Sequence, residues 1–572
     1  MSGWHPTRRD LLLVMMVLVI FGLFLQLDLS FRFTDSKGSD SLLGFKLGIG
    51  GRRPGESSRR TGKKGGWVSD GVSSHLARPL AGVSEAKVKW GDEGALRTEV
   101  AAHAPGWTVF DQVYLFNGTW YIVTDHPSTI PLLRMMTSPG AEIWNDEESI
   151  NRREPTDKDM QIIFPSAAKR LWGQSASRIS GVTFLVNDPP QFLDHYYHFA
   201  AELLFGLWRT YSSLDPGINA AGQTQLPSPA RMMMPHVAAG KWNDYAKMNS
   251  FLSRAIFPSM SYEYQNDFLD RSDTQRAYML DRVVFADRAA AFRGPEFAKT
   301  WRTASEAATL GGSRYWWSPM RRNLLEFVGS SSGTTEINLE EFGVDDEDED
   351  DLIEEGGGVV VKDVPKFVRR AAVPEDPEDD SPALAKRGVI PERRVDLGTR
   401  REHSPGNPVI TYVSRQDWGR RMLIKKDHDE LVQHLNELQK KYGWEVHIVA
   451  MDKLTRDEQI RLAARTTIMM GVHGNGLTHL IWMNNLNPRA TVMEFFFPGG
   501  FAEDYEFTSR ALGIRHYGWW GNESFTAPNT PPVAYPEGFQ GNEIPISGKD
   551  VAQLIEQRLL VDRPPSDVDT RR

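Results

Sequence analysis

The second half of the chain alternates strand-like and helix-like segments, and this order restricts its fold more than any other feature. Apolar strand-like runs lie at residues 408–415, 444–451, 466–471 and 490–497. Helical patterns follow them at residues 429–441, 457–465, 477–483 and 549–560. Strands that alternate with helices predict a parallel sheet covered by helices. We therefore expect the second half to be an α/β domain of Rossmann type.

The first half is expected to be ordered from about residue 87. Beginning at Val109, VFDQVYLFNGTWYIVTD reads as two strands joined by an Asn117-Gly118 turn. Further strands are predicted at residues 182–186 and 282–285, and a helix at residues 195–208. The segment 87–328 is interpreted as a first lobe and 407–562 as a second.

The remaining segments have compositions that do not support a packed core. Residues 32–86 are rich in Gly, Ser, Arg and Lys and are predicted to form a flexible stem. Residues 329–406 contain DDEDEDD and are predicted to be a disordered acidic insertion, with a short tail at 563–572. The insertion contains Asp-x-Asp spacings, which some enzymes use to hold a divalent metal, but a solvated charge run is the favoured interpretation.

The N-terminus carries a predicted membrane anchor. LLLVMMVLVIFGLFLQL is uncharged and, extended to Phe31, reaches the length of a span, with only Asp28 interrupting it. Arg8 and Arg9 precede it, in the tail 1–10 that positive charge keeps in the cytosol. Without an A-x-A cleavage pattern, residues 11–31 are expected to be an uncleaved signal-anchor. The rest of the chain would then lie in the lumen of the Golgi or endoplasmic reticulum, as in a type II membrane protein.

Composition excludes several classes of chemistry. The chain has no cysteine, so disulfides, cysteine metal sites and thiol catalysis are excluded. A net charge of −9 argues against a nucleic-acid partner. Two Asn-x-Ser/Thr sequons, at Asn117 and Asn522, would accept glycans in a secretory lumen.

The most informative local motif is TTIMMGVHGNGLTHLIWM. A strand ends at Gly471, a turn holds His473, Gly474 and Gly476, and a helix follows. Glycines in such a turn let backbone N–H groups approach an anion, and His473 can donate to a phosphate oxygen. The alternative is that the glycines only make a tight strand–helix turn.

Two charged residues lie near the carboxyl ends of neighbouring predicted strands. Arg415 follows the strand 408–415, and Glu494 has a similar place on the strand 490–497. Ligands of open parallel sheets bind at that edge, where an Arg can pair with a diphosphate and a Glu with ribose hydroxyls. The alternatives are a surface ion pair for Arg415 and a solvated strand end for Glu494.

A second cluster lies in FLDHYYHFAAELLFGLW. On a helix, Asp194, His198 and Glu202 recur every four residues and share one face. A carboxylate beside an imidazole can position it for proton abstraction. A polar helix edge or a metal site would explain the same residues, although no fixed-spacing metal motif is present.

These motifs together resemble glycosyltransferase family 61, which includes O-linked GlcNAc transferases of the secretory pathway and xylosyltransferases. The resemblance rests on HYYHFAAELL, YVSR, GVHGNGLTHLIWM and MEFF, in that order, and spans roughly residues 106–560 apart from the insertion. The family often has Asn at Asp194 or His195.

The resemblance implies a GT-B fold, with two Rossmann-like lobes and the active site between them, and an inverting reaction. It places a UDP-sugar on Arg415, His473, Gly474, Gly476 and Glu494. The first-lobe residues then face a glycoprotein or polysaccharide acceptor, and positive groups replace a metal cofactor. Two other functions remain open, a glycoside hydrolase and a catalytically inactive sugar-binding membrane glycoprotein.

Overall fold

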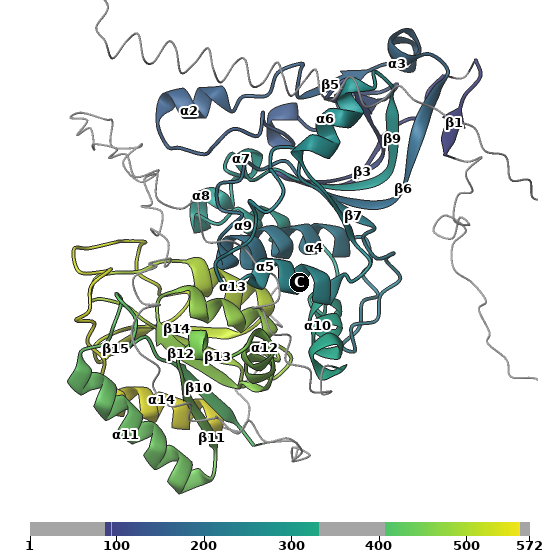
Figure 1. The fold of residues 1–572 in the computed structure, drawn as a ribbon. Helices are drawn as coiled ribbons and strands as arrows, with labels where there is room; N and C mark the ends of the chain where they lie inside the picture. Colours follow the sequence, from purple (N-terminus) through teal and green to yellow (C-terminus); the bar gives the residue numbers. More distant parts are fainter. Residues whose placement is uncertain (1–85, 93, 331–406, 561–572) are drawn as a thin grey trace, which may run out of the picture. The chain divides into compact units, whose positions relative to one another are not determined.

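The computed structural model describes residues 86–92, 94–330 and 407–560, and Figure 1 shows how their strands and helices are arranged. Two sheets are present in this part of the chain. The strands of the first sheet are β1 (Lys87–Lys89), β2 (Glu99–Ala104), β3 (Trp107–Phe116), β4 (Thr119–Val123), β5 (Met160–Ile163), β6 (Ser175–Val186), β7 (Arg231–Met233), β8 (Ser261–Glu263) and β9 (Tyr278–Ala286).

The first sheet is mixed, with a parallel half and an antiparallel half. β8, β7, β6 and β9 lie side by side and run parallel, an order typical of half a Rossmann fold. β9 then pairs antiparallel with β3, and β3 pairs antiparallel with β2 and β4. The predicted Asn117-Gly118 turn is confirmed: Phe116 pairs with Thr119, and both turn residues have positive φ.

The helices of this lobe follow its parallel strands. The segment after β6 begins as a π-helix, η4 (His198–Leu204), and continues as α4 (Phe205–Ser212). The other α-helices are α2 (Glu147–Arg152), α3 (Pro165–Trp172), α5 (Met248–Ile256), α6 (Gln265–Asp273), α7 (Arg288–Ala291), α8 (Phe297–Thr300), α9 (Ala304–Ala308) and α10 (Ser318–Ser330). Short 3₁₀ turns are η2 (Pro127–Thr129) and η3 (Leu133–Met135). Because α10 ends at Ser330, the lobe extends slightly beyond its predicted end at 328.

The second lobe confirms the predicted parallel α/β sheet. Its strand order is β11-β10-β12-β13-β14-β15, parallel except for β15 at the edge. The strands are β10 (Val409–Val413), β11 (Glu445–Val449), β12 (Ile468–Val472), β13 (Thr491–Phe495), β14 (Arg515–Trp520) and β15 (Glu523–Phe525). The chain passes from β10 to β11 on one side and to β12 on the other, so the order reverses there. Such switch points open a crevice at the carboxyl ends of the strands.

The helices of the second lobe cover both faces of this sheet (Figure 1). They are α11 (Lys425–Tyr442), α12 (Arg456–Arg465), α13 (Asp504–Leu512) and α14 (Gly548–Leu560), with the 3₁₀ segments η7 (Met451–Lys453) and η8 (Asn475–Trp482). Leu431, Leu435 and Leu438 make the buried stripe of α11, and α12 starts in a Thr455/Glu458 capping box. The helix predicted after the glycine turn is present as η8, in 3₁₀ geometry.

The two lobes share a packed core. The indole N–H of Trp317, before α10, donates to the carbonyl of Ile481 at 2.7 Å, and its ring stacks on Trp482. Trp482 in turn donates to the hydroxyl of Tyr196 at 3.1 Å. α10 packs against both α5 and α12. These contacts fix the glycine turn of the second lobe against the start of η4 in the first.

Several predictions fall outside the described residues. These are the signal-anchor at 11–31, most of the stem at 32–86, most of the acidic insertion at 329–406 and the tail. Within the described ranges, no helix combines the length and hydropathy that a membrane span requires. The anchor therefore stays a prediction.

Candidate functional site

A wide cleft of about 980 Å³ opens at the carboxyl ends of β10, β11 and β12. The loops that follow these strands form one wall, through Arg415, Met451, Gly474 and Gly476. The opposite wall comes from the first lobe, through Asp194, His195, Tyr196, Asp244, Tyr245, Lys247 and Met248. The cleft thus lies at the switch point where an α/β sheet of this order binds ligands.

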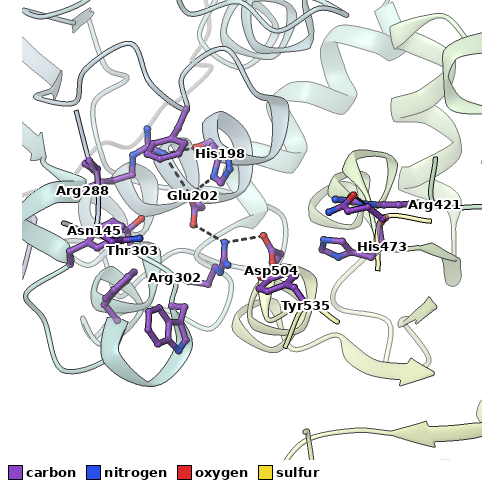
Figure 2. Close-up of a pocket in the computed structure, with 16 residues that line it drawn as sticks. Asn145, His198, Glu202, Arg288, Arg302, Thr303, Arg421, His473, Asp504 and Tyr535 are labelled. Atoms are coloured by element: carbon purple, nitrogen blue, oxygen red, sulfur yellow. Dashed lines mark hydrogen bonds and ion pairs between the residues drawn. The ribbon is translucent and has the colours of Figure 1, made fainter. Parts of the chain in front are cut away.

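A small cavity of about 120 Å³ lies next to this cleft (Figure 2). Charged side chains and histidines from both lobes line it, namely His198, Glu202, Arg288, Arg302, Arg421, His473 and Asp504. Aromatic rings complete it, from Phe192, Phe292, Phe297, Trp301 and Tyr535. Ionisable side chains from both lobes therefore converge in the cavity.

Two chain segments separate the two hollows. Gly474 lines the wide cleft, whereas its neighbour His473 lines the small cavity. In the first lobe, His195 lines the cleft and His198, with its ring centroid 4.9 Å away, lines the cavity. A ligand in the cleft that reaches past Gly474 therefore meets residues of the cavity.

His198 and Glu202 form the hydrogen-bonded pair that the sequence predicts. Nδ1 of His198 lies 2.7 Å from a carboxylate oxygen of Glu202, and both residues belong to η4. π-helical turns are rare and frequent at functional sites. Burial alone would raise the pKa of Glu202, but His198, Arg302 and Arg288 lower it to about 2. Glu202 is therefore an anion that can orient the imidazole.

A chain of ion pairs extends from this pair into the second lobe. Arg302 lies 3.6 Å from Glu202 and 2.9 Å from Asp504, the first residue of α13 (Figure 2). Although burial opposes the charged form, Asp504 and Glu202 raise the pKa of Arg302. Arg288 approaches Glu202 at 3.6 Å and is held by Asp188 at 2.6 Å. Buried charges need such partners, and here the partners join the two lobes.

The predicted grouping of Asp194 with His198 and Glu202 is wrong. The helical segment begins after Asp194, which lies in a turn, so the four-residue helical spacing does not apply to it. Asp194 is exposed and lines the wide cleft rather than the cavity. It therefore faces the region where the cleft's ligand would lie.

The predicted contact between Glu494 and a ribose is also wrong. Glu494 is fully buried in β13 and lines neither hollow. One of its oxygens lies 2.5 Å from Nδ1 of His473 and the other 2.8 Å from Nε2 of His516 on β14. A carboxyl group in the sheet interior must satisfy both oxygens within the protein, so Glu494 supports His473 instead of a ligand.

The glycine turn and Arg415 lie together, as predicted. A Cβ atom on Gly474 would lie 2.5 Å from Nη1 of Arg415, so the guanidinium rests directly against this glycine. Glycine is needed at position 476 for a different reason: a Cβ atom there would lie 2.8 Å from the side chain of Val413. Gly474 therefore leaves space for the arginine at the cleft, and Gly476 permits close packing of η8 on β10.

Other predicted features have a clear place in the structure. Asn117 and Asn522 are exposed in the turns after β3 and β14, where an oligosaccharide would not disturb the core. In the described part of the chain, no group of three or more His, Asp or Glu side chains is arranged to hold a metal ion. Whether the protein needs a metal stays a prediction.

Sequence reasoning missed several residues of the cavity, chiefly Arg288, Arg302, Asp504 and Tyr535. They come from distant segments, and none belongs to a motif of fixed spacing. Arg421 belongs to the same group: it is buried, and its Nε donates to Oε1 of Gln540 at 2.6 Å. The only local signal for these residues was charge inside otherwise apolar stretches.

The fold and the cleft define an α/β protein with a nucleotide-type binding crevice, and comparison with known proteins identifies its family. A match to the family described as "Glycosyltransferase 61" covers residues 196–492. The chain therefore belongs to the glycosyltransferase 61 family, which confirms the resemblance, and by that membership it is a glycosyltransferase.

One relative is also similar over part of its length. The EGF domain-specific O-linked N-acetylglucosamine transferase of Drosophila melanogaster is 34% identical to the chain over 113 residues. That segment is 19% of this chain and 19% of the relative, so the match spans about a fifth of the relative's length.

Proposed function

We propose that this enzyme transfers GlcNAc or xylose, with inversion, from a UDP-sugar to a protein or glycan acceptor in the secretory pathway. The observation that carries the proposal is the wide cleft at the switch point of the second sheet, where Arg415 lies against Gly474. A diphosphate there would find a guanidinium and the backbone of a strand–helix turn together. The similarity to a GlcNAc transferase supports GlcNAc as the first sugar to test.

The two hollows divide the donor between them. The nucleoside diphosphate lies in the wide cleft, and its sugar passes Gly474 toward His473 and the small cavity. Placing the anomeric carbon at this junction brings it between the diphosphate site and the His198–Glu202 pair. This arrangement is that of a GT-B enzyme, in which a cleft between two lobes holds the reacting groups.

Inversion needs one displacement at the anomeric carbon. The acceptor hydroxyl attacks, His198 takes its proton, and the bond from carbon to the diphosphate oxygen breaks with its electron pair left on UDP. Glu202 stabilises the imidazolium that forms, since its carboxylate lies 2.7 Å from Nδ1. Arg415 opposes the charge that grows on the leaving group, so we propose that a metal ion is dispensable.

We also propose that the enzyme is bound to the membrane of the Golgi or endoplasmic reticulum, anchored by residues 11–31. The exposed sequons at Asn117 and Asn522 give a direct test of the lumenal orientation. In a eukaryotic host, an endoglycosidase should increase the electrophoretic mobility of the full chain, and Asn117→Gln with Asn522→Gln should abolish that increase. An unchanged mobility of the unmutated protein would count against a lumenal catalytic part.

The activity is tested with the full chain purified in mild detergent. UDP release is measured for a panel of UDP-sugars, including UDP-GlcNAc and UDP-xylose, with EDTA present and with candidate acceptors. Turnover of one donor and metal-free binding of UDP support the proposal. Cleavage of glycosides without use of UDP-sugars would indicate a hydrolase, and sugar binding without either reaction would indicate an inactive binding protein.

A further inference from the structure

His473 occupies the position where a donor's leaving group and sugar would meet. It follows the last residue of β12 and lines the small cavity, while the next residue, Gly474, lines the wide cleft beside Arg415. Figure 2 shows its ring on the second-lobe side of the cavity, near Arg421. The mechanism proposed above gives this histidine no role.

The imidazole of His473 is held on several sides. Its ring stacks on Phe496 with centroids 5.6 Å apart, and Tyr505 and Phe539 lie 5.5 and 5.4 Å away. Nδ1 is 2.5 Å from Glu494, which is fully buried. Since Nδ1 points into the protein, Nε2 is the ring nitrogen that can serve the cavity side. A side chain fixed in this way is preorganised for one direction of hydrogen bonding.

The contact of the second Glu494 oxygen with His516 indicates which of the two groups carries the shared proton. That oxygen contacts Nε2 of His516 at 2.8 Å, and Nδ1 of His516 is buried without a hydrogen-bond partner among the described residues. An unpartnered lone pair there is more readily tolerated than an unpartnered N–H. His516 therefore carries its proton on Nε2 and donates to Glu494, which leaves the other carboxyl oxygen to share a proton with His473.

The electrostatic surroundings agree with a neutral Glu494–His473 pair. Burial, reinforced by Asp504, raises the pKa of Glu494 well above its usual range despite Arg421. Burial, reinforced by Arg421 and other cations, lowers the pKa of His473 well below its usual range. Both directions favour a carboxylic acid that donates to Nδ1, with the imidazole proton on Nε2. The charged and titratable groups around the pair are Arg302, Arg415, Arg421, Asp504, Tyr505, Glu506, His516 and Tyr535.

We propose that Glu494 and His473 form a proton store that stabilises the departing diphosphate, with His516 as the residue that positions Glu494. Nε2–H of His473 donates a hydrogen bond to the diphosphate oxygen that leaves the anomeric carbon. As the carbon–oxygen bond breaks and its electron pair stays on that oxygen, the carboxyl proton of Glu494 moves to Nδ1. The result is an imidazolium beside the new negative charge and a carboxylate that keeps the His516 bond; the proton returns when UDP leaves.

This inference rests on the proposed function, and Glu494→Gln tests it. The amide keeps the size of the side chain, can donate to Nδ1 of His473 and can accept from His516, so it preserves the geometry and removes only the transferable proton. Glu263→Gln is the matched control, because Glu263 is a part-buried carboxylate on β8 that pairs with Arg271 at 2.6 Å and lines neither hollow. Both full-length variants must melt within a few degrees of the unmutated enzyme.

We expect Glu494→Gln to lower kcat roughly a hundred- to a thousandfold while the Kd of UDP, measured by calorimetry, stays within about threefold. The proton must be present on the pair, so kcat of the unmutated enzyme falls as pH rises through the pair's raised pKa. That alkaline fall should be missing in Glu494→Gln and retained in Glu263→Gln. A purely structural role would not remove it.

The outcomes separate the two proposals. Turnover of a UDP-sugar by the unmutated enzyme, together with unchanged kcat in Glu494→Gln, would overturn the proton store and leave the transferase intact. Loss of UDP affinity equal to the loss of kcat would also overturn it, because His473 would then act in ground-state binding. Absence of UDP-sugar turnover in the unmutated enzyme would overturn the proposed function, and the inference with it.

Discussion

The wide cleft and the small cavity share the same two walls, yet they are built from different parts of the chain. In the cleft, the loops at the ends of β10, β11 and β12 bring Gly474 and Gly476 beside Arg415, and further charged side chains line its rim. The cavity is made of ionised side chains that pair with one another across the lobes. Backbone and glycine bind by shape, whereas paired ions hold reactive groups in fixed protonation states. The difference indicates that the cleft provides affinity and the cavity provides chemistry.

The largest effect is expected when the partly exposed imidazole of the cavity, that of His198, is removed. His198→Ala should lower kcat about a hundred- to ten-thousandfold, the usual effect of losing a general base, and leave the Kd of UDP unchanged. His434→Ala is the matched control, since His434 also pairs with a glutamate, Glu437, but on the surface of α11. Steady-state kinetics and UDP titration measure both effects. Near-normal kcat in His198→Ala would show that the base lies elsewhere.

The ion pairs of the cavity should matter for stability as well. Arg302→Leu leaves the buried Glu202 and the half-buried Asp504 without their shared cation, which should cost about 3–5 kcal/mol in the free energy of unfolding. Asp504→Asn in the same chain should restore part of that loss, because the double variant no longer has the unpaired carboxylate of α13. Arg314→Leu, at an exposed arginine of the same lobe, is the control. Denaturant unfolding that shows no coupling between positions 302 and 504 would contradict a bridge between the lobes.

Substitutions in the cleft should change the affinity for UDP rather than kcat. Charged hydrogen bonds contribute about 1.5–3 kcal/mol, so Arg415→Ala should weaken UDP binding roughly ten- to a hundredfold, as measured by metal-free calorimetry. Arg420→Ala is the control, because Arg420 contacts Gln540 at 3.0 Å and lines neither hollow. Gly474→Ala should act like a milder Arg415→Ala by displacing the guanidinium. Equal UDP affinity in the Arg415 and Arg420 variants would place the diphosphate outside the cleft.

The contrast also explains what could be predicted from the sequence. The second sheet and the glycine turn were predictable because each depends on neighbours in the chain: an apolar strand, a turn and a helix. Arg302 and Asp504 were not, since they meet across 202 positions and neither belongs to a periodic pattern. Glu494 was placed correctly near its strand end, but the prediction that it contacts a ribose was wrong, because the residue is fully buried. Nothing in a single strand shows that histidines of two neighbouring segments take both of its oxygens.

Prediction from the sequence was limited in the same way in the first lobe. Of its four parallel strands, β6 and β9 were predicted but the short strands β7 and β8 were missed, whereas the β3–β4 hairpin was predicted from its turn. Asp194 was misplaced because helical spacing was applied to it although the helical segment begins only after it. The helical face of His198 and Glu202 survived this error, since both lie inside η4.

The smallest expected effect tests the charge of Glu202 itself. Its pKa is about 2 in the folded protein, against 4.5 for an unperturbed glutamate, because His198, Arg302 and Arg288 offset the effect of burial. A carboxyl group with a lowered pKa stabilises the fold at pH values above 4.5, and that contribution is lost as pH falls toward 2. At pH 3.5, about one unit below the unfolded value, the loss should be roughly 1.4 kcal/mol.

The variant Glu202→Gln has no carboxylate whose contribution can be lost. The free energy of unfolding of this variant should therefore fall less between pH 7 and pH 3.5 than that of the unmutated protein. Glu430→Gln, at an exposed residue of α11, should follow the unmutated protein. Identical pH dependence for the Glu202 variant and the unmutated protein would mean that the cavity's ion pairs do not hold this carboxylate ionised, and the distinction between a chemical cavity and a binding cleft would lose its electrostatic basis.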